Sequence, residues 1–297
     1  RDKPVTFSDW RKLLDRKDIQ AVFIATPCDL HVEMAIAALK AGKHVYCEKP
    51  VGITPESIRE LVKVAKNSKT VFQAGQQRRS EPRLRATIAR IHEGVAGKVI
   101  YVKAQRHNSG DLAHDGSSAD WFFFPNRSGD LITENSVHNL DVCNWAINSY
   151  PERATGFGGN IMYVNDPPGR TNMDGYTLSY EYQNGVKLAF TQVAFHPGKM
   201  ACAWQHTLVY GTLGAVDLDT ATFYPHNDGE PRVLAEREER APRDRHIADF
   251  YECIRTGKKP VADIIAGASG ALTSVLGREA IYRKKILTWK ELGVDFL

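Results

Sequence analysis

The sequence predicts an α/β fold in which part of a doubly wound parallel sheet is followed by an α+β domain with an open sheet. Two observations predict this order. Up to about residue 80, short apolar runs alternate with helical segments, as in a parallel sheet with helical crossovers. Beyond residue 82, period-two segments follow one another directly, and Asn184-Gly185 marks a hairpin turn between two of them. We therefore expect two domains, residues 1–80 and residues 81–297.

The first domain begins with an apolar run at 18–27 that ends in Pro27, which is typical of a strand buried on both faces. Residues 29–42 have helical spacing and stop at Gly42. Residues 44–50 then predict a second strand that ends in polar side chains.

The next helix is announced by Thr54 as N-cap and Pro55 at the first helical position, and it extends to about Asn67. Residues 71–75 predict a third strand. Right-handed crossovers place the carboxyl ends of all three strands along one edge, where ligands bind in open α/β sheets. Those ends carry Thr26-Pro27, Glu48-Lys49-Pro50 and Gln76-Gln77-Arg78-Arg79.

The second domain opens with a helix from Pro82 to Gly94. The strands expected after it are 98–105, 155–164, 174–183, 186–195, 205–211 and 215–218. The helices expected among them are 136–148, 244–256 and 264–282. Sequential strands joined by hairpins indicate a mixed or antiparallel open sheet.

The glycine-rich turn that normally follows the first strand of a dinucleotide-binding fold is missing. Nothing before Ala21 resembles it. We therefore expect that roughly 50–70 residues, the first two strand–helix units of the half-sheet, lie outside this sequence.

The composition is that of an ordinary globular protein, with 42% hydrophobic and 25% charged residues. The net charge of +4 comes from scattered side chains, so we expect no nucleic-acid partner. The chain has no apolar run of about 18 residues, so we expect no membrane span. Five cysteines without a C-x-x-C pair indicate free thiols, which favours a cytoplasmic location.

Lys49, at the end of the second strand, is the first candidate for chemistry. Beside a positively charged nicotinamide ring, like charge and desolvation would lower its pKa from about 10.4. Such a lysine can polarise or deprotonate a substrate hydroxyl. The alternative is a solvated loop lysine beside a turn proline.

His138 is the second candidate. If Ser136 onward is helical, Glu134 lies near the face of His138 and Asp141 lies one turn beyond it. A carboxylate beside an imidazole fixes its tautomer and raises its basicity, as for a general base. A metal site formed by Glu134 and His138 with His107 or His114, or a structural histidine, are the alternatives; we expect no metal.

The polar, aromatic stretch from Arg106 to Arg127 is the third candidate, because a loop of this length in a compact domain is often functional. Its hydrogen-bonding and stacking side chains suit a sugar ring, and an ordinary surface loop is the alternative. The candidate residues are Arg106, His107, Asn108, Asp111, His114, Asp115 and Trp121.

Four motifs together resemble the glucose–fructose oxidoreductase / inositol dehydrogenase / rhizopine-catabolism (Gfo/Idh/MocA) family. They are Ala25-Thr26-Pro27 with His31, Ala41-Gly42-Lys43-His44-Val45 leading to Glu48-Lys49-Pro50, Gly75-Gln76-Gln77-Arg78-Arg79, and His138-Asn139-Leu140-Asp141. Three positions depart from the family pattern, since Gln77 replaces Asn, Glu134 replaces Asp and Ser136 replaces Gly.

The resemblance implies a Rossmann domain followed by an open, mostly antiparallel sheet that mediates a homodimer or homotetramer. It implies hydride transfer between NAD, with NADP as the alternative, and a secondary alcohol of a carbohydrate, polyol or glycoside. His138 accepts the hydroxyl proton, Lys49 binds the same oxygen, and Glu134 orients His138 or binds a neighbouring hydroxyl. The residues expected at the cofactor are Thr26, Pro27, His31, Glu48, Lys49 and Gln77.

Three questions stay open at this level. The fold also hosts NAD-dependent glycosidases or epimerases that oxidise transiently, and non-catalytic dinucleotide-binding sensors. The string around His138 is similar to a bacterial subgroup with export signals, so a periplasmic location is the alternative. Finally, the hairpin 174–183 and 186–195 shows apolar residues that we assign to both of its faces, which predicts an oligomer contact. These residues are Tyr176, Leu178, Tyr180, Tyr182, Leu188, Phe190, Val193 and Phe195.

Overall fold

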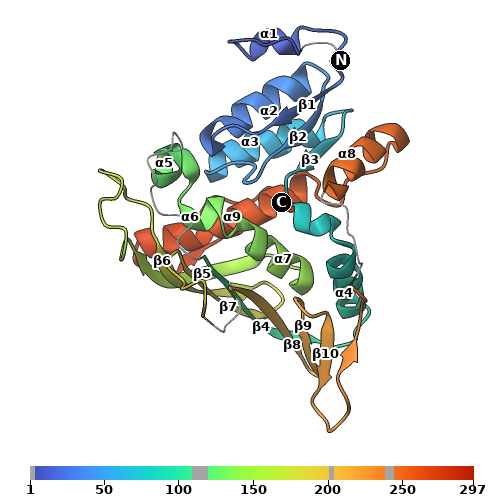
Figure 1. The fold of residues 1–297 in the computed structure, drawn as a ribbon, viewed down its shortest axis with the longest axis vertical. Helices are drawn as coiled ribbons and strands as arrows, with labels where there is room; N and C mark the ends of the chain where they lie inside the picture. The colour runs from blue at the N-terminus through green and yellow to red at the C-terminus, as the bar shows by residue number, and fades with distance from the viewer. Residues whose placement is uncertain (1–3, 109–119, 201–203, 238–243) are drawn as a thin grey trace.

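A computed structural model describes residues 4–108, 120–200, 204–237 and 244–297 and contains two sheets. A three-stranded sheet lies at one end of the molecule and a nine-stranded sheet at the other, with the long helix α9 (Ile264–Tyr282) between them (Figure 1). The predicted fold class, a parallel half followed by an open sheet, is confirmed.

The first sheet is parallel, in the order β1-β2-β3. The strands are β1 (Ala21–Ile24), β2 (His44–Cys47) and β3 (Phe72–Ala74). They are connected by α2 (His31–Lys40) and α3 (Pro55–Lys66). The Thr54 hydroxyl accepts from the Ser57 amide at 3.3 Å, which is the predicted N-cap. All five expected elements are present, and a short helix α1 (Arg11–Leu14) precedes them.

The second sheet has the order β11-β10-β9-β8-β4-β7-β6-β5-β12. Its strands are β4 (Val99–His107), β5 (Pro151–Gly159), β6 (Gly175–Tyr182), β7 (Lys187–Val193), β8 (Gln205–Gly211), β9 (Gly214–Asp217), β10 (Thr222–Pro225), β11 (Arg232–Val233) and β12 (Leu287–Thr288). Strands β4 and β7 pair in parallel and the other pairs are antiparallel, as expected of a mostly antiparallel sheet. The short strands β10, β11 and β12 were not predicted.

Helices cover one face of the second sheet. They are α7 (Val137–Ile147) and α9, and the short α6 (Leu131–Glu134) packs on both of them. Helix α4 (Pro82–His92) packs on α7, and the short α5 (Pro125–Ser128) lies toward the first domain. Helices α8 (Arg245–Thr256) and α9 return to the first sheet. Phe250 packs on Tyr46 with ring centres 5.9 Å apart, and the Ala74 amide donates to Ala262 O at 2.8 Å. The end of the chain therefore contributes to the core of the first sheet, across the expected boundary at residue 80.

The β6–β7 hairpin differs from the expectation that both of its faces are apolar. Register pairs Leu178 with Phe190 and Tyr180 with Leu188, so these four side chains share one face, and all are buried. The opposite face carries exposed polar residues such as Thr177 and Ser179. The expectation of two apolar faces was wrong. Residues that pair across the two strands lie on the same side of the sheet, but they were assigned to opposite sides. The apolar-face argument for an oligomer therefore no longer holds. A homodimer or homotetramer stays a prediction that rests on the family resemblance.

Two further features concern the chain as a whole. Cys28, Cys47, Cys143 and Cys253 are free and buried, as the spacing predicted, and Cys202 lies outside the described residues. Across the described ranges, every helix is too short or too polar to span a bilayer.

Candidate active site

The carboxyl ends of β2 and β3 meet at one point because Gly75 has no side chain. A Cβ on Gly75 would lie 2.6 Å from Glu48 Oε2 and 2.9 Å from Glu48 Cα, closer than atoms can pack. The Gly75 amide donates to Cys47 O at 2.7 Å. Glycine is therefore required here, and it places Gln76 beside the Glu48-Lys49-Pro50 turn.

Lys49 forms an ion pair with Glu134. Its Nζ donates to Glu134 Oε1 at 2.5 Å and to the Glu134 main-chain oxygen at 2.8 Å. The two side chains are 17% and 14% exposed, so water screens this pair only in part. The expectation that Glu134 orients His138 is corrected, because its carboxylate binds the lysine.

Glu134 is positioned by Asp130, which precedes helix α6. The buried Asp130 carboxylate accepts from the amides of Leu131 at 2.6 Å and Met173 at 3.0 Å, and from the Tyr282 hydroxyl. Its backbone has φ 75° and ψ 163°, a conformation that costs about 1–3 kcal/mol for a residue with a Cβ. Burial raises the pKa of Asp130 to about 6, against the opposing effect of these hydrogen bonds. The hydrogen bonds of the Asp130 carboxylate compensate for this backbone strain, and they fix the start of α6.

His138 lies in the first turn of α7 and is 8% exposed. Its Nδ1 is 3.1 Å from Gln76 Oε1. Because an amide oxygen can only accept, Nδ1 carries the proton and Nε2 keeps its lone pair. Burial lowers the pKa of His138 well below 6.5, and the positive charges of Lys49, Arg106 and Arg78 lower it further. The imidazole is therefore neutral, with a basic nitrogen available.

Asp141 does not support His138 as we expected. Its carboxylate is bound in a bidentate ion pair by Arg79, with Nε and Nη2 each at 2.8 Å. The Arg79 guanidinium also lies 5.0 Å from the Trp145 ring centre. The sequence placed Asp141 one helical turn from His138, but a buried arginine from the neighbouring turn η2 (Gln77–Ser80) takes both of its oxygens. The group that fixes the imidazole tautomer is Gln76.

A buried polar network continues from this helix to β4, β6 and β7. Arg106 Nε donates to Asn135 Oδ1 at 2.5 Å, which also accepts from Gln192 Nε2 at 2.9 Å. Gln192 Nε2 donates to Asn108 Oδ1 at 3.2 Å, and Gln192 Oε1 accepts from the hydroxyls of Ser136 and Tyr176. The serine that departs from the family pattern thus completes a network beneath α7.

Two expected substrate residues lie elsewhere. His107 Nε2 is 3.0 Å from Thr191 Oγ1, and its ring centre is 5.6 Å from that of His196. Because β4 extends to His107, alternation turns this side chain to the face opposite Arg106, which corrects the assignment. Burial, and then His196, lower the pKa of His107.

Trp121 lies in the short turn η3 (Asp120–Phe123), edge-on to Phe122. The adjoining helix α5 binds the first domain, since Arg127 Nε donates to Asp29 Oδ2 at 2.8 Å. A role of Trp121 in substrate binding stays a prediction. The other candidates of this stretch, Asp111, His114 and Asp115, lie outside the described residues.

The residues expected at the cofactor lie at the predicted sheet edge, and their side chains differ in burial and in hydrogen-bond partners. His31 is 1% exposed, and its Nδ1 and Nε2 lie 2.7 Å from Pro50 O and 2.9 Å from Thr26 O. It joins the loops that follow β1 and β2. Thr26 and Pro27 are half-buried and Gln77 is exposed, so these side chains have surface available. Glu48 accepts from the Tyr46 hydroxyl and the Lys49 amide, each at 3.3 Å.

A cleft of about 540 Å³ opens beside His138, within the size range of small-molecule sites. Its walls come from η2, α4, β4, β8 and the segments after β9 and β11. The lining residues are Gln77, Arg78, Glu81, Arg83, Leu84, Arg106, His138, Trp204, Gln205, Leu218, Asp219 and Arg237.

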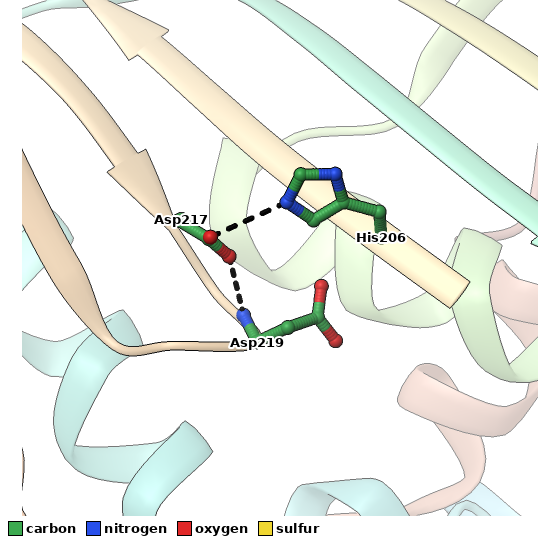
Figure 2. A group of neighbouring side chains, drawn as sticks. All are labelled: His206, Asp217 and Asp219. Carbon is green, nitrogen blue, oxygen red and sulfur yellow. Dashed lines mark hydrogen bonds and ion pairs between the residues drawn. The ribbon is translucent and has the colours of Figure 1, made fainter. Parts of the chain in front are cut away.

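Asp219 belongs to a cluster with His206 and Asp217 whose candidate ligand atoms lie within 4.8 Å of one another (Figure 2). Hydrogen bonds already occupy most of these atoms. Asp217 accepts from the Asp219 amide at 2.9 Å and faces His206 Nε2 at 3.3 Å, and Asp219 accepts from the Thr207 amide at 2.9 Å. The cluster stabilises the turn after β9. Of the residues named in the metal alternative, Glu134 binds Lys49 through Oε1 and His138 binds Gln76 through Nδ1.

The sequence reasoning gave no role in the site to Gln76, Asn135, Gln192 or Tyr176. Gln76 lies two positions after β3 and was named among the polar residues at the strand ends, but it was not identified as the partner of His138. The other three become functional candidates only through long-range contacts that no local pattern signals.

Two family models match the chain. Residues 3–76 match the model of an oxidoreductase family with an NAD-binding Rossmann fold, and residues 84–217 match the model of the GFO/IDH/MocA C-terminal domain. The two matches follow the two sheets of the structure.

Curated relatives match over different shares of their length. A 2,7-anhydro-N-acetylneuraminate hydratase of Mediterraneibacter gnavus is 27% identical over 97% of this chain and 75% of its own length. A levoglucosan dehydrogenase of Pseudarthrobacter phenanthrenivorans is 30% identical over 60% of this chain. The chain spans 50% of the length of that second relative.

Solved structures share the fold. Levoglucosan dehydrogenase in complex with NADH matches with a TM-score of 0.82 and 20% identity, over 95% of this chain and 82% of that chain. The myo-inositol 2-dehydrogenase of Lactobacillus plantarum matches with a TM-score of 0.74 and 22% identity, over 95% and 84%.

Proposed function

The chain belongs to the Gfo/Idh/MocA family of oxidoreductases, and we propose that it transfers a hydride between NAD and a secondary alcohol of a sugar, polyol or glycoside. NADP is the alternative cofactor. The observation that carries the proposal is the neutral His138, whose Nδ1 is committed to Gln76 and whose ring lines the cleft.

The sheet edge fits a nicotinamide dinucleotide. Close approach of the strand ends at Gly75 brings the polar loops after β2 and β3 side by side, and Lys49 in the first of these loops is paired with Glu134. Thr26, Pro27, Glu48 and Gln77 would hold the cofactor, and His31 would support them by joining two of these loops. When bound, the cofactor supplies the hydride acceptor or donor. A role for dinucleotide at this edge agrees with the general position of ligands in open α/β sheets.

In the oxidation direction, His138 Nε2 accepts the proton of the substrate hydroxyl. Its low pKa keeps the nitrogen unprotonated, and Gln76 holds the ring in the tautomer that the step requires. In the reverse direction, the imidazolium returns the proton to the carbonyl oxygen. Gln76 acts through His138 and is a positioning residue.

Lys49 binds the oxygen that reacts. An ammonium has three donors, and Glu134 accepts from two of them, so the third would bind the substrate oxygen. Its positive charge stabilises the negative charge that develops on the oxygen as the proton leaves. Glu134 fixes the lysine and balances its charge when the site is empty. Arg106 lines the cleft and would contact the rest of the substrate, and Asn135 and Gln192 join it to the buried Asn108.

A second candidate is an enzyme that oxidises its substrate transiently and returns the hydride. The relative aligned over 97% of this chain is named as a hydratase, which favours this candidate. The same residues serve both functions, because each begins with removal of a hydroxyl proton and a hydride. A non-catalytic sensor does not require a neutral histidine and a charge-balanced lysine near each other.

Turnover assays separate these functions. The protein at its natural length is given NAD with levoglucosan, inositols and related polyols, and separately with 2,7-anhydro-N-acetylneuraminate. A dehydrogenase accumulates NADH in proportion to product. A transient redox enzyme forms product without NADH accumulation and exchanges deuterium between labelled cofactor and substrate. Failure of both signals over the panel, with cofactor bound, contradicts the proposed hydride transfer.

A further inference from the structure

The Lys49–Glu134 ion pair joins two segments that belong to different domains. Lys49 lies in the loop that follows β2 of the first sheet, and Glu134 ends the four-residue helix α6 of the second domain. A single helical turn does not hold its own shape in water, because so short a helix forms few of its hydrogen bonds. The position of Glu134 therefore depends on the contacts that other elements make with the start of α6.

The start of α6 is connected to Glu134 by the main chain and to α9 by a side chain. The Glu134 amide donates to Asp130 O at 2.9 Å, so these two residues close one helical turn. The buried Asp130 carboxylate accepts from the hydroxyl of Tyr282, the last residue of α9. The Tyr282 hydroxyl thus binds the residue that fixes the turn carrying Glu134.

Arg278 lies one turn before Tyr282 on α9 and binds both segments directly. Its Nη1 donates to Gly129 O at 2.9 Å, at the start of α6, and to Ile53 O at 3.3 Å, in the loop after β2. Its Nε and Nη2 lie 3.2 and 3.1 Å from Glu279 Oε1. The Arg278 side chain is only 9% exposed, so the guanidinium is held in one orientation between the two segments.

The two segments also touch each other at Gly129. Its backbone has φ 81°, and a Cβ there would lie 2.8 Å from Ile53 Cγ2. Glycine therefore allows the loop after β2 to pack against the start of α6. Ile53 lies four residues after Lys49, and Gly129 lies five residues before Glu134. Arg278 thus binds both sides of the contact that brings the lysine and the glutamate together.

We propose that Arg278 and Tyr282 are positioning residues that hold Lys49 and Glu134 at contact distance. The two residues are four positions apart, so their side chains lie on one face of α9. Arg278 holds the loop of Lys49 against the start of α6, and Tyr282 fixes the turn that ends at Glu134. Both would act through the ion pair. This inference rests on the proposed function only for the use of Lys49 in catalysis.

A purely structural role of the two side chains gives a different result in a test. In that case their loss lowers the stability of the fold and leaves the Lys49–Glu134 pair of the folded protein unchanged. The reactivity of the Lys49 amine separates the two roles. An amine that is bound to a carboxylate and only 17% exposed is less accessible to an acylating reagent than a released one.

Competitive acetylation measures this reactivity without any turnover. The protein at its natural length is treated with a trace of acetic anhydride at fixed pH, and mass spectrometry gives the labelling of Lys49 relative to the exposed Lys63 of α3. Arg278→Gln and Tyr282→Phe should each raise the relative labelling of Lys49 by about three- to tenfold, the effect of one lost hydrogen bond. Arg278→Lys should restore part of the protection, because an ammonium can donate to both main-chain oxygens. In turnover assays kcat should fall by a similar factor, while the Kd for NADH changes little.

Two matched controls remove similar groups at other positions. Arg283→Gln removes a guanidinium at the end of the same helix that also binds Glu279, but whose side chain is 47% exposed. Tyr251→Phe removes the hydroxyl of a tyrosine on α8 that is 44% exposed, as Tyr282 is. Both controls should keep the wild-type labelling of Lys49.

The outcomes that contradict the proposal differ from those that contradict the proposed function. Wild-type labelling of Lys49 in folded Arg278→Gln and Tyr282→Phe contradicts the proposal, even if urea denaturation shows a loss of stability. An equal rise in the controls also contradicts it, because the fold is then loosened in general. If Arg278→Gln does not fold, Tyr282→Phe decides alone. Raised labelling in the variants, with no hydride transfer by the wild type, keeps this inference and rejects the proposed function.

Discussion

The loops around His31 and the start of helix α7 around His138 each bury an imidazole, but they use it differently. His31 is 1% exposed, and both of its nitrogens lie near main-chain oxygens of two loops. His138 is 8% exposed, and one nitrogen binds Gln76 while the ring faces a cleft lined by arginines. Burial and residue type are nearly the same. The partners of each nitrogen, and the charges around the ring, separate a structural histidine from a base.

The strongest way to break this comparison is to remove the base. His138→Ala should lower kcat by about 10²–10⁴-fold, because a positioned proton acceptor is lost. The Kd for NADH should change little, since the imidazole lies on the second domain. Steady-state kinetics and cofactor titration check this. A variant that keeps the wild-type kcat on the true substrate contradicts the role of His138.

Removal of the oxygen-binding cation should follow in size. Lys49→Met should lower kcat by about 10²–10³-fold, as loss of one donor to a developing oxyanion does. The exposed Lys63 of α3 provides the matched control, since Lys63→Met removes the same charge away from the site. The same rate loss in both variants would mean that general charge, and no direct contact, is responsible.

His31→Ala tests the structural role that the comparison assigns to His31. His31→Ala leaves the main-chain oxygens of Thr26 and Pro50 without their partner, so the free energy of unfolding should fall by about 1–3 kcal/mol. Urea denaturation of His31→Ala and His138→Ala checks the contrast. A larger loss of stability in His138→Ala than in His31→Ala would reverse our assignment of the two histidines.

Gln76 should have the smallest effect among these residues. Gln76→Leu removes the acceptor of His138 Nδ1–H, and kcat should fall by about five- to tenfold, the value of one neutral hydrogen bond. Because the tautomer is no longer fixed, the acid limb of the pH profile should also move, and Gln76→Glu should restore activity with a raised pKa of His138. A fall in kcat without any change of the pH profile would indicate a purely structural role.

Much of the fold could be predicted because its signals are local. Helix α9 was expected at its observed bounds, 264–282, and the Thr54 cap and the Asn184-Gly185 turn mark other boundaries. Strands β10, β11 and β12 escaped because two to four residues are too few for a period to show.

The site could be predicted only where its residues follow strand ends or start a helix. Lys49 and His138 were found in this way. Their partners were not, because Gln76 and Arg79 reach α7 across 62 positions of the sequence. His107 was expected in a loop, but β4 continues two residues beyond the expected end at 105, and alternation along the strand points His107 to the face opposite Arg106.

The pH dependence of stability follows from His138. The pKa of His138 is lower in the folded protein than its ordinary value of 6.5, so the unfolded chain binds the proton first as the pH falls. Its contribution to stability is therefore constant above pH 6.5 and decreases below it. The acid limb of kcat/KM for the free enzyme should likewise lie below pH 6.5.

The most direct test of the account is the protonation state of His138, measured by NMR of protein labelled with ¹⁵N-histidine and assigned with His138→Ala. We predict a neutral ring with the proton on Nδ1 and an unprotonated Nε2 from pH 8 to below the ordinary pKa of 6.5. A ring that charges at pH 6.5 or above, or that carries its proton on Nε2 when neutral, would contradict the assignment of His138 as the base.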